Sequence, residues 1–243
     1  MFDTLVIIPA HNEERSITRV LREIYNLNLD ADILVVNDGS TDRTAEIIRE
    51  EKCNIITLPY NIGYGGALQT GFKYAVARGY DFVVQFDSDG QHDPQDIVII
   101  MDKLKNNEAD IVIGSRFKGK GTLKTGFMKK TAISLFRLLI KMFAKTAITD
   151  PTSGLQGLTR PVFGYYSARG NFPGDYPDAD VLIHMLRCGF RVVEFPANIC
   201  TRDAGRSMHS GLKPVFYFFK VILSIIVVLL REKIFKEGCE YNG

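Results

Sequence analysis

The chain has 243 residues, of which 46% are hydrophobic and 24% charged, which is enough for one well-buried domain with a short appendage. Its net charge of +2, from 30 basic and 28 acidic residues, gives no indication of a nucleic-acid partner, and we expect none. The basic charge is concentrated, because segment 116–145 carries nine Lys or Arg residues and no Asp or Glu.

Short apolar runs alternate with helical patterns through the first half of the chain. The helical patterns begin near residue 11, run through residues 47 and 48, and begin again after residue 63. This alternation predicts a fold of the α/β class, with a doubly wound, mostly parallel sheet and helices on both faces. The predicted strands are residues 4–8, 33–36, 54–58, 80–86 and 111–114.

The second half of the chain is less regular. It has a predicted helix at 180–188, a strand at 191–195 and a final helical segment from about 215 to 233. The apolar part of that segment, 215–230, has sixteen residues and includes Lys220, whereas a membrane-spanning helix needs about twenty. We expect this C-terminal apolar helix to lie in a membrane interface or to pack against another subunit of a homo-oligomer.

A further helix is predicted at 130–145. Its polar residues follow one another at steps of four, three, four and four, which places them in one stripe, and apolar residues fill the remainder. A narrow basic stripe on a broad apolar surface is typical of an amphipathic helix at a membrane interface. A buried helix with a solvated charged edge would show the same pattern. The polar residues are Lys130, Ser134, Arg137, Lys141 and Lys145.

Two carboxylates, Asp87 and Asp89, follow the predicted strand 80–86. Open α/β sheets bind ligands at the carboxyl ends of their strands, and aspartates buried there are costly unless a positive charge neutralises them. Hard divalent cations prefer oxygen ligands. The pair therefore predicts a metal site that also contacts phosphate, with a solvated acidic turn as the alternative.

A glycine cluster at Gly63, Gly65 and Gly66 opens the helix that follows the third predicted strand. Glycine permits close backbone approach to a ligand, and a helix N-terminus favours phosphate, although helix packing would also explain the cluster. The dinucleotide-binding fingerprint would follow the first strand instead, so a Rossmann dehydrogenase is not expected.

Several polar motifs follow one another along the chain in a fixed order. They are Pro9-Ala10-His11-Asn12-Glu13, Asn37-Asp38-Gly39-Ser40-Thr41-Asp42, Asn61-Ile62-Gly63, Asp87-Ser88-Asp89-Gly90-Gln91-His92-Asp93-Pro94, Gly114-Ser115-Arg116-Phe117, Asp150-Pro151-Thr152-Ser153-Gly154-Leu155 and Arg202-Asp203-Ala204-Gly205-Arg206-Ser207. Together they resemble the motifs of family 2 inverting glycosyltransferases, which have a GT-A fold, and the later ones resemble the dolichyl-phosphate mannose synthase branch, whose members are polyprenyl-phosphate hexosyltransferases. The resemblance covers about residues 4–210.

The resemblance implies roles for the first motifs in binding a nucleotide sugar. Asp87, Asp89 and Gln91 would reach Mg²⁺ or Mn²⁺ and the diphosphate, with Asp89 as a catalytic residue, because the cation stabilises the charge that develops on the leaving phosphate. Arg116 and Arg202 would meet phosphate groups, with an ion pair to Asp203 as the alternative for Arg202. The remaining donor-binding residues would be Pro9, Ala10, Glu13, Asp38, Gly63 and Ser88.

The acceptor side is implied by the later motifs. Arg116, Lys130, Ser134 and Ser153 would contact the phosphate of a lipid acceptor. One departure from the family's pattern is Met208, which stands where lysine is usual. Either Arg206 compensates for it or the loop binds diphosphate more weakly.

A neutral hydroxyl acceptor would require a general base, whereas a lipid phosphate is already an anionic nucleophile. Asp178 and Asp180 precede or open the predicted helix 180–188 and are the candidates for that base. Asp180 has a second interpretation as an acidic residue in the first turn of a helix, where acids are favoured. Both interpretations remain open.

The sequence thus predicts a metal-dependent inverting glycosyltransferase that moves a hexose from a UDP-hexose or GDP-mannose to a polyprenyl phosphate. We expect a peripheral or monotopic protein on the cytoplasmic face of the cell membrane, with a donor half at 1–115, an acceptor half at 116–211 and a C-terminal helix at 212–243. The alternatives are a family 2 enzyme that extends a saccharide, a nucleotidyltransferase and a non-catalytic nucleotide-sugar-binding subunit. A nucleotidyltransferase would usually carry a glycine-rich loop after the first strand, and residues 9–14 contain no glycine.

Overall fold

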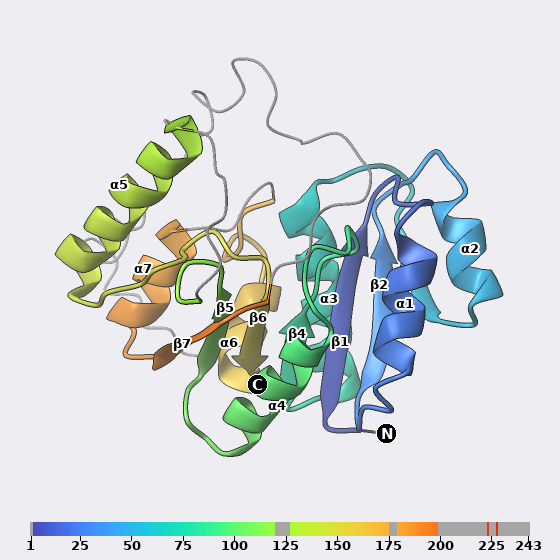
Figure 1. Cartoon of the computed structure of the whole chain (residues 1–243), viewed down its shortest axis with the longest axis horizontal. Helices are drawn as coiled ribbons and strands as arrows, with labels where there is room; N and C mark the ends of the chain where they lie inside the picture. The colour runs from blue at the N-terminus through green and yellow to red at the C-terminus, as the bar shows by residue number, and fades with distance from the viewer. Residues whose placement is uncertain (1, 120–126, 175–178, 199–222, 224–226, 228–243) are drawn as a thin grey trace.

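The computed structural model of the chain describes residues 2–119, 127–174 and 179–198, together with positions 223 and 227 (Figure 1). The predicted C-terminal helix therefore lies outside the described residues except for Leu223 and Val227, which are both helical and exposed. The predicted boundary at 211/212 stays a prediction for the same reason.

A single seven-stranded sheet runs through the molecule. Its strands lie in the order β3-β2-β1-β4-β6-β5-β7, and all neighbouring pairs are parallel except those that involve β6. This arrangement confirms the predicted doubly wound, mostly parallel sheet. The strands are β1 (Thr4–Ala10), β2 (Asp32–Asn37), β3 (Asn54–Thr57), β4 (Phe82–Gln85), β5 (Ile111–Ser115), β6 (Gln156–Thr159) and β7 (Val192–Pro196).

Strand β6 was not predicted from the sequence. It has four residues and lies antiparallel between β4 and β5, with Gly157 opposite Val84 and Val112. A methyl group on Gly157 would clash with the Ile100 side chain, so glycine is what lets helix α4 (Gln95–Lys105) pack onto the sheet there. Because β6 comes from the second half of the chain, the predicted donor and acceptor halves share one sheet. The boundary at 115/116 stays a prediction.

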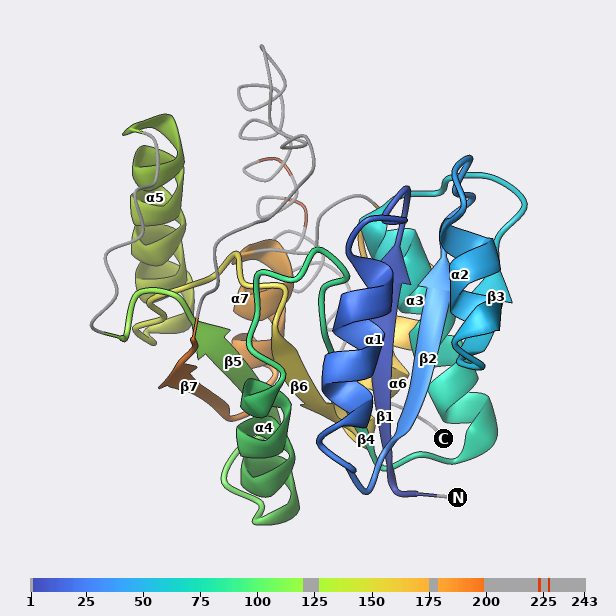
Figure 2. The same ribbon diagram turned by 45° about the vertical axis from the view of Figure 1, so that its right-hand side comes forward.

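Helices cover both faces of the sheet, as predicted (Figure 2). One face is covered by α1 (Ile17–Tyr25), α2 (Thr44–Glu50) and α4. The other face is covered by α3 (Tyr64–Arg78), α5 (Phe127–Ala144), α6 (Arg160–Ser167) and α7 (Ala179–Arg187). The residues of β1 divide between the two cores, because successive side chains of a strand point to opposite faces: Leu5 and Ile7 join one core, and Val6 and Ile8 the other.

Helix α5 has both buried and exposed apolar side chains. Phe136 and Ile140 pack in the core and Ile133 is also buried, whereas Leu138 and Met142 are 59% and 56% exposed. The exposed pair lies one helical turn apart and therefore shares a face. Among the described residues, no helix is both long enough and apolar enough to cross a membrane.

Candidate functional site

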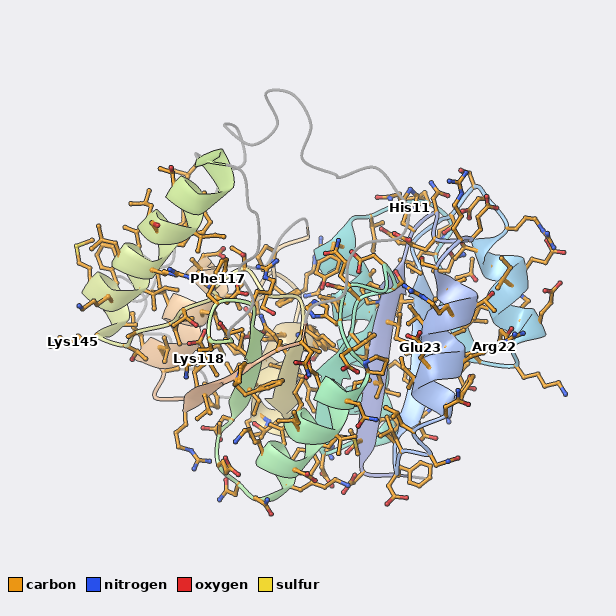
Figure 3. All side chains as sticks on the ribbon, viewed as in Figure 1. His11, Arg22, Glu23, Phe117, Lys118 and Lys145 are labelled. Atoms are coloured by element: carbon orange, nitrogen blue, oxygen red, sulfur yellow. The ribbon has the colours of Figure 1, made fainter. Side chains whose placement is uncertain are left out.

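The predicted donor motifs meet at one edge of the sheet. Strands β1, β2 and β4 are parallel, so the loops that follow Ala10, Asn37 and Gln85 all leave from their carboxyl ends. His11, labelled in Figure 3, marks this edge above β1. Ligands of open α/β sheets bind at such an edge.

Hydrogen bonds between the first two loops hold them together. The backbone N–H of Asn12 donates to the Ser40 hydroxyl at 3.0 Å, and the Asn12 side-chain oxygen accepts from the backbone N–H of Thr41 at 2.8 Å. The backbone N–H of Glu13 donates to the Thr44 hydroxyl at 2.8 Å. The loop that carries the predicted donor residue Glu13 is thus fastened to the start of α2.

Asp38 organises the approach to α3. Its carboxylate is buried, and its two oxygens accept the backbone N–H groups of Ile62 at 2.8 Å and Gly63 at 3.0 Å. Gly63 has a φ of 93°, a conformation that side chains disfavour. His11 Nδ1 donates to the Asp38 carbonyl at 2.7 Å. The structure therefore places Asp38, Gly63 and the predicted nucleoside-binding loops together.

The turn after β4 is tied to β1 through Ser88. The Ser88 hydroxyl is buried and donates to the carbonyl of Pro9 at 2.8 Å. Pro9 and Ala10 are themselves buried at the end of β1. Ser88 thereby fixes where the two aspartates on either side of it stand.

The Asp87 carboxylate is contacted from two directions. The Tyr64 hydroxyl, at the first residue of α3, donates to Oδ1 at 2.9 Å, and His92 Nε2 lies 3.6 Å from Oδ2. Burial raises the pKa of Asp87, but His92, Tyr64 and the charge of Arg116 together outweigh it and hold the pKa below its ordinary value. The carboxylate is therefore ionised, and 26% of the side chain stays exposed.

Asp89 and Gln91 form the rest of the predicted metal set. Oδ1 of Asp89 accepts the backbone N–H of Gln91 at 3.0 Å, across a turn in which Gly90 has a φ of 70°. No group of three or more His, Cys, Asp or Glu side chains suited to a metal was found within the described ranges. Two carboxylates and an amide oxygen are nevertheless the oxygen donors that Mg²⁺ and Mn²⁺ take when phosphate and water complete the coordination. The residues present fit such an ion.

Buried charges hold the loop that was predicted to contact the acceptor. The Arg116 guanidinium donates to both oxygens of Asp150, at 2.7 and 2.8 Å, and to the Thr152 carbonyl at 2.9 Å. The Asp150 side chain is fully buried. Ser153, predicted to contact acceptor phosphate, is buried and its hydroxyl donates to the Gly114 carbonyl at 2.6 Å. Arg116 and Ser153 therefore both shape this loop, and their phosphate contacts stay predictions.

Glu194, on β7, is a site-forming residue that the sequence analysis did not find. Its carboxylate accepts the backbone N–H groups of Thr149 at 2.9 Å and Asp150 at 2.8 Å, and also the Thr149 hydroxyl. The signal was present, because a lone acid within an otherwise apolar strand needs hydrogen-bond partners. Tyr64 and His92 were missed too, although both stand inside or beside the motifs.

The polar stripe of α5 reaches the same loop. Arg137 donates to the Thr149 carbonyl at 2.7 Å, and its guanidinium lies 4.7 Å from the ring centre of Phe117, which Figure 3 labels beneath α5. Ser134 and Lys141 are exposed. The side chain of Lys130 lies outside the described part of the chain.

The candidate bases are only partly described. Asp180 is buried in the first turn of α7. Burial raises the pKa of Tyr166, and the nearby Asp180 raises it further. Asp178, Arg202, Arg206, Ser207 and Met208 lie outside the described residues.

Comparison with known proteins bears on this site. The model of the family described as Glycosyl transferase family 2 matches residues 5–166. The polyprenol monophosphomannose synthase of Mycolicibacterium smegmatis is 30% identical over 230 residues, which cover 90% of this chain and 85% of that protein. The UDP-N-acetylglucosamine–dolichyl-phosphate N-acetylglucosaminyltransferase of Methanococcus voltae is 34% identical over 180 residues, covering 66% and 71%.

A solved structure has the same fold. Glucosyl-3-phosphoglycerate synthase from Mycobacterium tuberculosis, in complex with Mn²⁺ and UDP-glucose, matches with a TM-score of 0.65 at 20% identity and covers 92% of this chain and 77% of that one. This likeness confirms the predicted GT-A type of fold.

Proposed function

The chain belongs to glycosyl transferase family 2 and is a glycosyltransferase, and from this premise we propose that it moves a hexose from a nucleotide sugar to a polyprenyl phosphate. The observation that carries the proposal is the position of Asp87 and Asp89 on the turn after β4, at the carboxyl edge of the sheet, where the charge of Arg116 acts on the Asp87 carboxylate. Such a site can bind a diphosphate on one side and an anionic acceptor on the other.

The donor side combines a metal with a nucleoside pocket. Asp87, Asp89 and Gln91 would hold Mg²⁺ or Mn²⁺, which when bound stabilises negative charge on the leaving diphosphate. A protein of the same fold binds Mn²⁺ with UDP-glucose, which supports a divalent ion here. The nucleoside would lie against Pro9, Ala10, Glu13, Asp38 and Gly63, with Ser88 fixing the turn and Arg202 contacting phosphate.

The acceptor is proposed to be a lipid phosphate. A phosphate oxygen is already anionic, so it attacks the anomeric carbon without a strong general base while the bond to the diphosphate breaks on the opposite face. The configuration at that carbon is inverted. Cations are required instead of a base. Arg116 and Lys130, the latter on α5, would supply positive charge, and Ser134 and Ser153 would complete the contacts with the phosphate.

Two relatives support a lipid-linked acceptor through their names, one a polyprenol monophosphomannose synthase and the other a dolichyl-phosphate transferase. The sugars in their names differ, and both donor classes therefore remain in the proposal. UDP-hexose is our first choice of donor and GDP-mannose the second. The exposed Leu138 and Met142 of α5, beside Lys141, support docking at a membrane surface. We place that surface on the cytoplasmic side, where nucleotide sugars are available, and allow for a homo-oligomer.

Asp89→Ala tests this function. With UDP-glucose, UDP-N-acetylglucosamine or GDP-mannose as donor and a short polyprenyl phosphate as acceptor, the wild type should form glycosyl phosphate only when Mg²⁺ or Mn²⁺ is present. Asp89→Ala should lose at least about a thousandfold in rate while it keeps the thermal unfolding profile. Asp81→Ala, at an exposed site, is the control. Full activity of Asp89→Ala would end the metal proposal.

The saccharide-extending alternative needs a base. The double variant Asp178→Asn with Asp180→Asn should keep its turnover on polyprenyl phosphate, because that acceptor brings its own charge. A large loss of rate in the folded double variant would favour the alternative instead.

A further inference from the structure

Beyond the predicted metal ligands, Asp87 is surrounded by groups with no role in the function proposed above. The Tyr64 hydroxyl donates to Oδ1 at 2.9 Å from the first turn of α3. On the other side stands Gly154, in the loop of the predicted acceptor motif. A methyl group on Gly154 would lie 2.6 Å from Asp87 Oδ2, 2.8 Å from the Tyr64 hydroxyl oxygen and 3.0 Å from Asp87 Oδ1.

We propose that Tyr64 and Gly154 are positioning residues, which together hold the Asp87 carboxylate in the orientation that binds the metal. Tyr64 orients the carboxylate through a directed hydrogen bond. Gly154 lets the acceptor loop close over it, because any side chain there would displace the carboxylate or the hydroxyl. The inference rests on the proposed function, since it concerns how the metal carboxylate is held.

The rest of the structure explains why these two contacts are well defined. Tyr64 follows Gly63, whose N–H is bound by Asp38, so the start of α3 cannot shift freely. Gly154 follows Ser153, whose hydroxyl donates to the carbonyl of Gly114 at the end of β5. Asp87 therefore stands between a donor-side helix and an acceptor-side loop that are each fastened to the sheet. Hydrogen-bonded partners of metal ligands typically contribute 10- to 100-fold to metal affinity.

The chain offers matched controls for both residues. Tyr80 is buried and its hydroxyl donates to the Asp32 carboxylate at 2.8 Å, so Tyr80→Phe removes a similar bond at the amino end of β2, away from the site. Among the described residues, a methyl group on Gly174 would have only the Ile62 carbonyl oxygen near it, at 4.0 Å, so Gly174→Ala adds the same group without a clash there.

The test measures Mn²⁺ binding by electron paramagnetic resonance, with UDP present, alongside thermal unfolding and transfer kinetics. Tyr64→Phe should weaken Mn²⁺ binding about tenfold, and Gly154→Ala by more, because the added methyl moves the carboxylate itself. In both variants a higher Mn²⁺ concentration should restore much of the lost kcat. Without metal, Tyr64→Phe and Tyr80→Phe should unfold at similarly lowered temperatures, but only in Tyr64→Phe should a given Mn²⁺ concentration add less stabilisation than in the wild type.

Wild-type Mn²⁺ affinity in either Tyr64→Phe or a folded Gly154→Ala variant would overturn the inference, as would equal losses in the controls. Failure of the wild type to bind Mn²⁺ or to transfer sugar would overturn the proposed function, and with it this inference. The two failures are thus distinct, because the first occurs in an active, metal-dependent wild type.

Discussion

In the predicted donor half of the site, backbone N–H groups of one loop are bound by individual side chains of another, whereas in the predicted acceptor half the loops are held around a buried ion pair. Asp38 binding Ile62 and Gly63 is typical of the first half. The ion pair of Arg116 with Asp150, supported by Glu194, is typical of the second.

The two halves differ in how many independent contacts hold their loops. A donor-side bond is one of several parallel links between neighbouring loops, so the loss of one leaves others in place. In the acceptor half the main links run through one ion pair, because Glu194 holds the backbone of Asp150, Asp150 holds Arg116, and Arg116 holds Thr152. Ser153 and Arg137 add separate bonds to the same loop. We expect the acceptor half to be damaged more by a single substitution.

Arg116→Met should have the largest effect on stability. It leaves the fully buried Asp150 carboxylate without its cation, and breaking a buried pair in this way typically costs about 3–5 kcal/mol. Urea unfolding of the variant measures the loss. Arg160→Met, which breaks an exposed pair with Asp81, is the control and should change little. Equal stability of the two variants would contradict the contrast between buried and exposed pairs.

Asp96 joins the two halves, and Asp96→Asn tests what its buried carboxyl group costs. Its Oδ2 accepts the backbone N–H of Asn198, beyond β7, whereas its buried Oδ1 has no hydrogen-bond partner among the described residues. Burial raises the pKa of Asp96 from 3.8 to about 6. In the unfolded chain the carboxyl releases its proton at lower pH than in the folded protein, so stability falls as pH rises through the interval between these two values.

Above pH 6 the wild type therefore carries a cost of about 3 kcal/mol that asparagine, which cannot ionise, removes. Asp96→Asn should be more stable than wild type at pH 8, and the gain should shrink as pH approaches 4. Chemical unfolding at several pH values measures this. Asp102→Asn, at an exposed position of the same helix, should show no such dependence. A gain that is constant with pH would refute the assignment.

Much of the fold was predictable because most of its strands have clear local patterns. The residues of β1, β2 and β5 are apolar runs with turn residues after them, and the paired aspartates mark the carboxyl end of β4. Strand β6 was not predictable in this way, since its four residues include Gly157, whose role depends on its contact with Ile100.

The residues of the candidate site also divide into those that the sequence predicts and those that depend on tertiary packing. Motif residues such as Asp38 and Asp87 lie at strand ends, so parallel topology alone brings them together. The contacts of Glu194 depend on residues more than forty positions away, and no local pattern specifies them. The burial of Ser153 and the engagement of Arg116 are likewise results of tertiary packing.

Glu194→Gln should weaken the hold on the Asp150 backbone in the acceptor half. Oε1 of Glu194 accepts both backbone N–H groups, and Oε2 lies 2.9 Å from the Thr149 N–H and from the Thr149 hydroxyl. In the amide an N–H₂ group replaces one of these oxygens and faces the Thr149 N–H, so the buried donors are no longer fully satisfied, at a cost of about 2 kcal/mol. The Asp150 backbone should loosen, which hydrogen exchange at Thr149 and Asp150 would detect. Glu108→Gln, at a surface pair with Lys103, is the control. Unchanged exchange in the folded variant would mean that Glu194 does not hold the loop.

Asp38→Asn is the corresponding change on the donor side, and we expect the smallest loss of stability there, about 1 kcal/mol. The amide oxygen still accepts from either Ile62 or Gly63, and the neighbouring links through Asn12 and Glu13 remain. The larger effect should fall on the nucleotide, with UDP affinity reduced several-fold in a thermal-shift titration, because the loop before α3 is less well fixed. Asp42→Asn, which retains an oxygen for the Thr44 N–H, is the control. A stability loss in Asp38→Asn as large as that of Arg116→Met would contradict this difference between the two halves. The several separate bonds of the donor loops would then protect them no better than the single ion pair protects the acceptor loop.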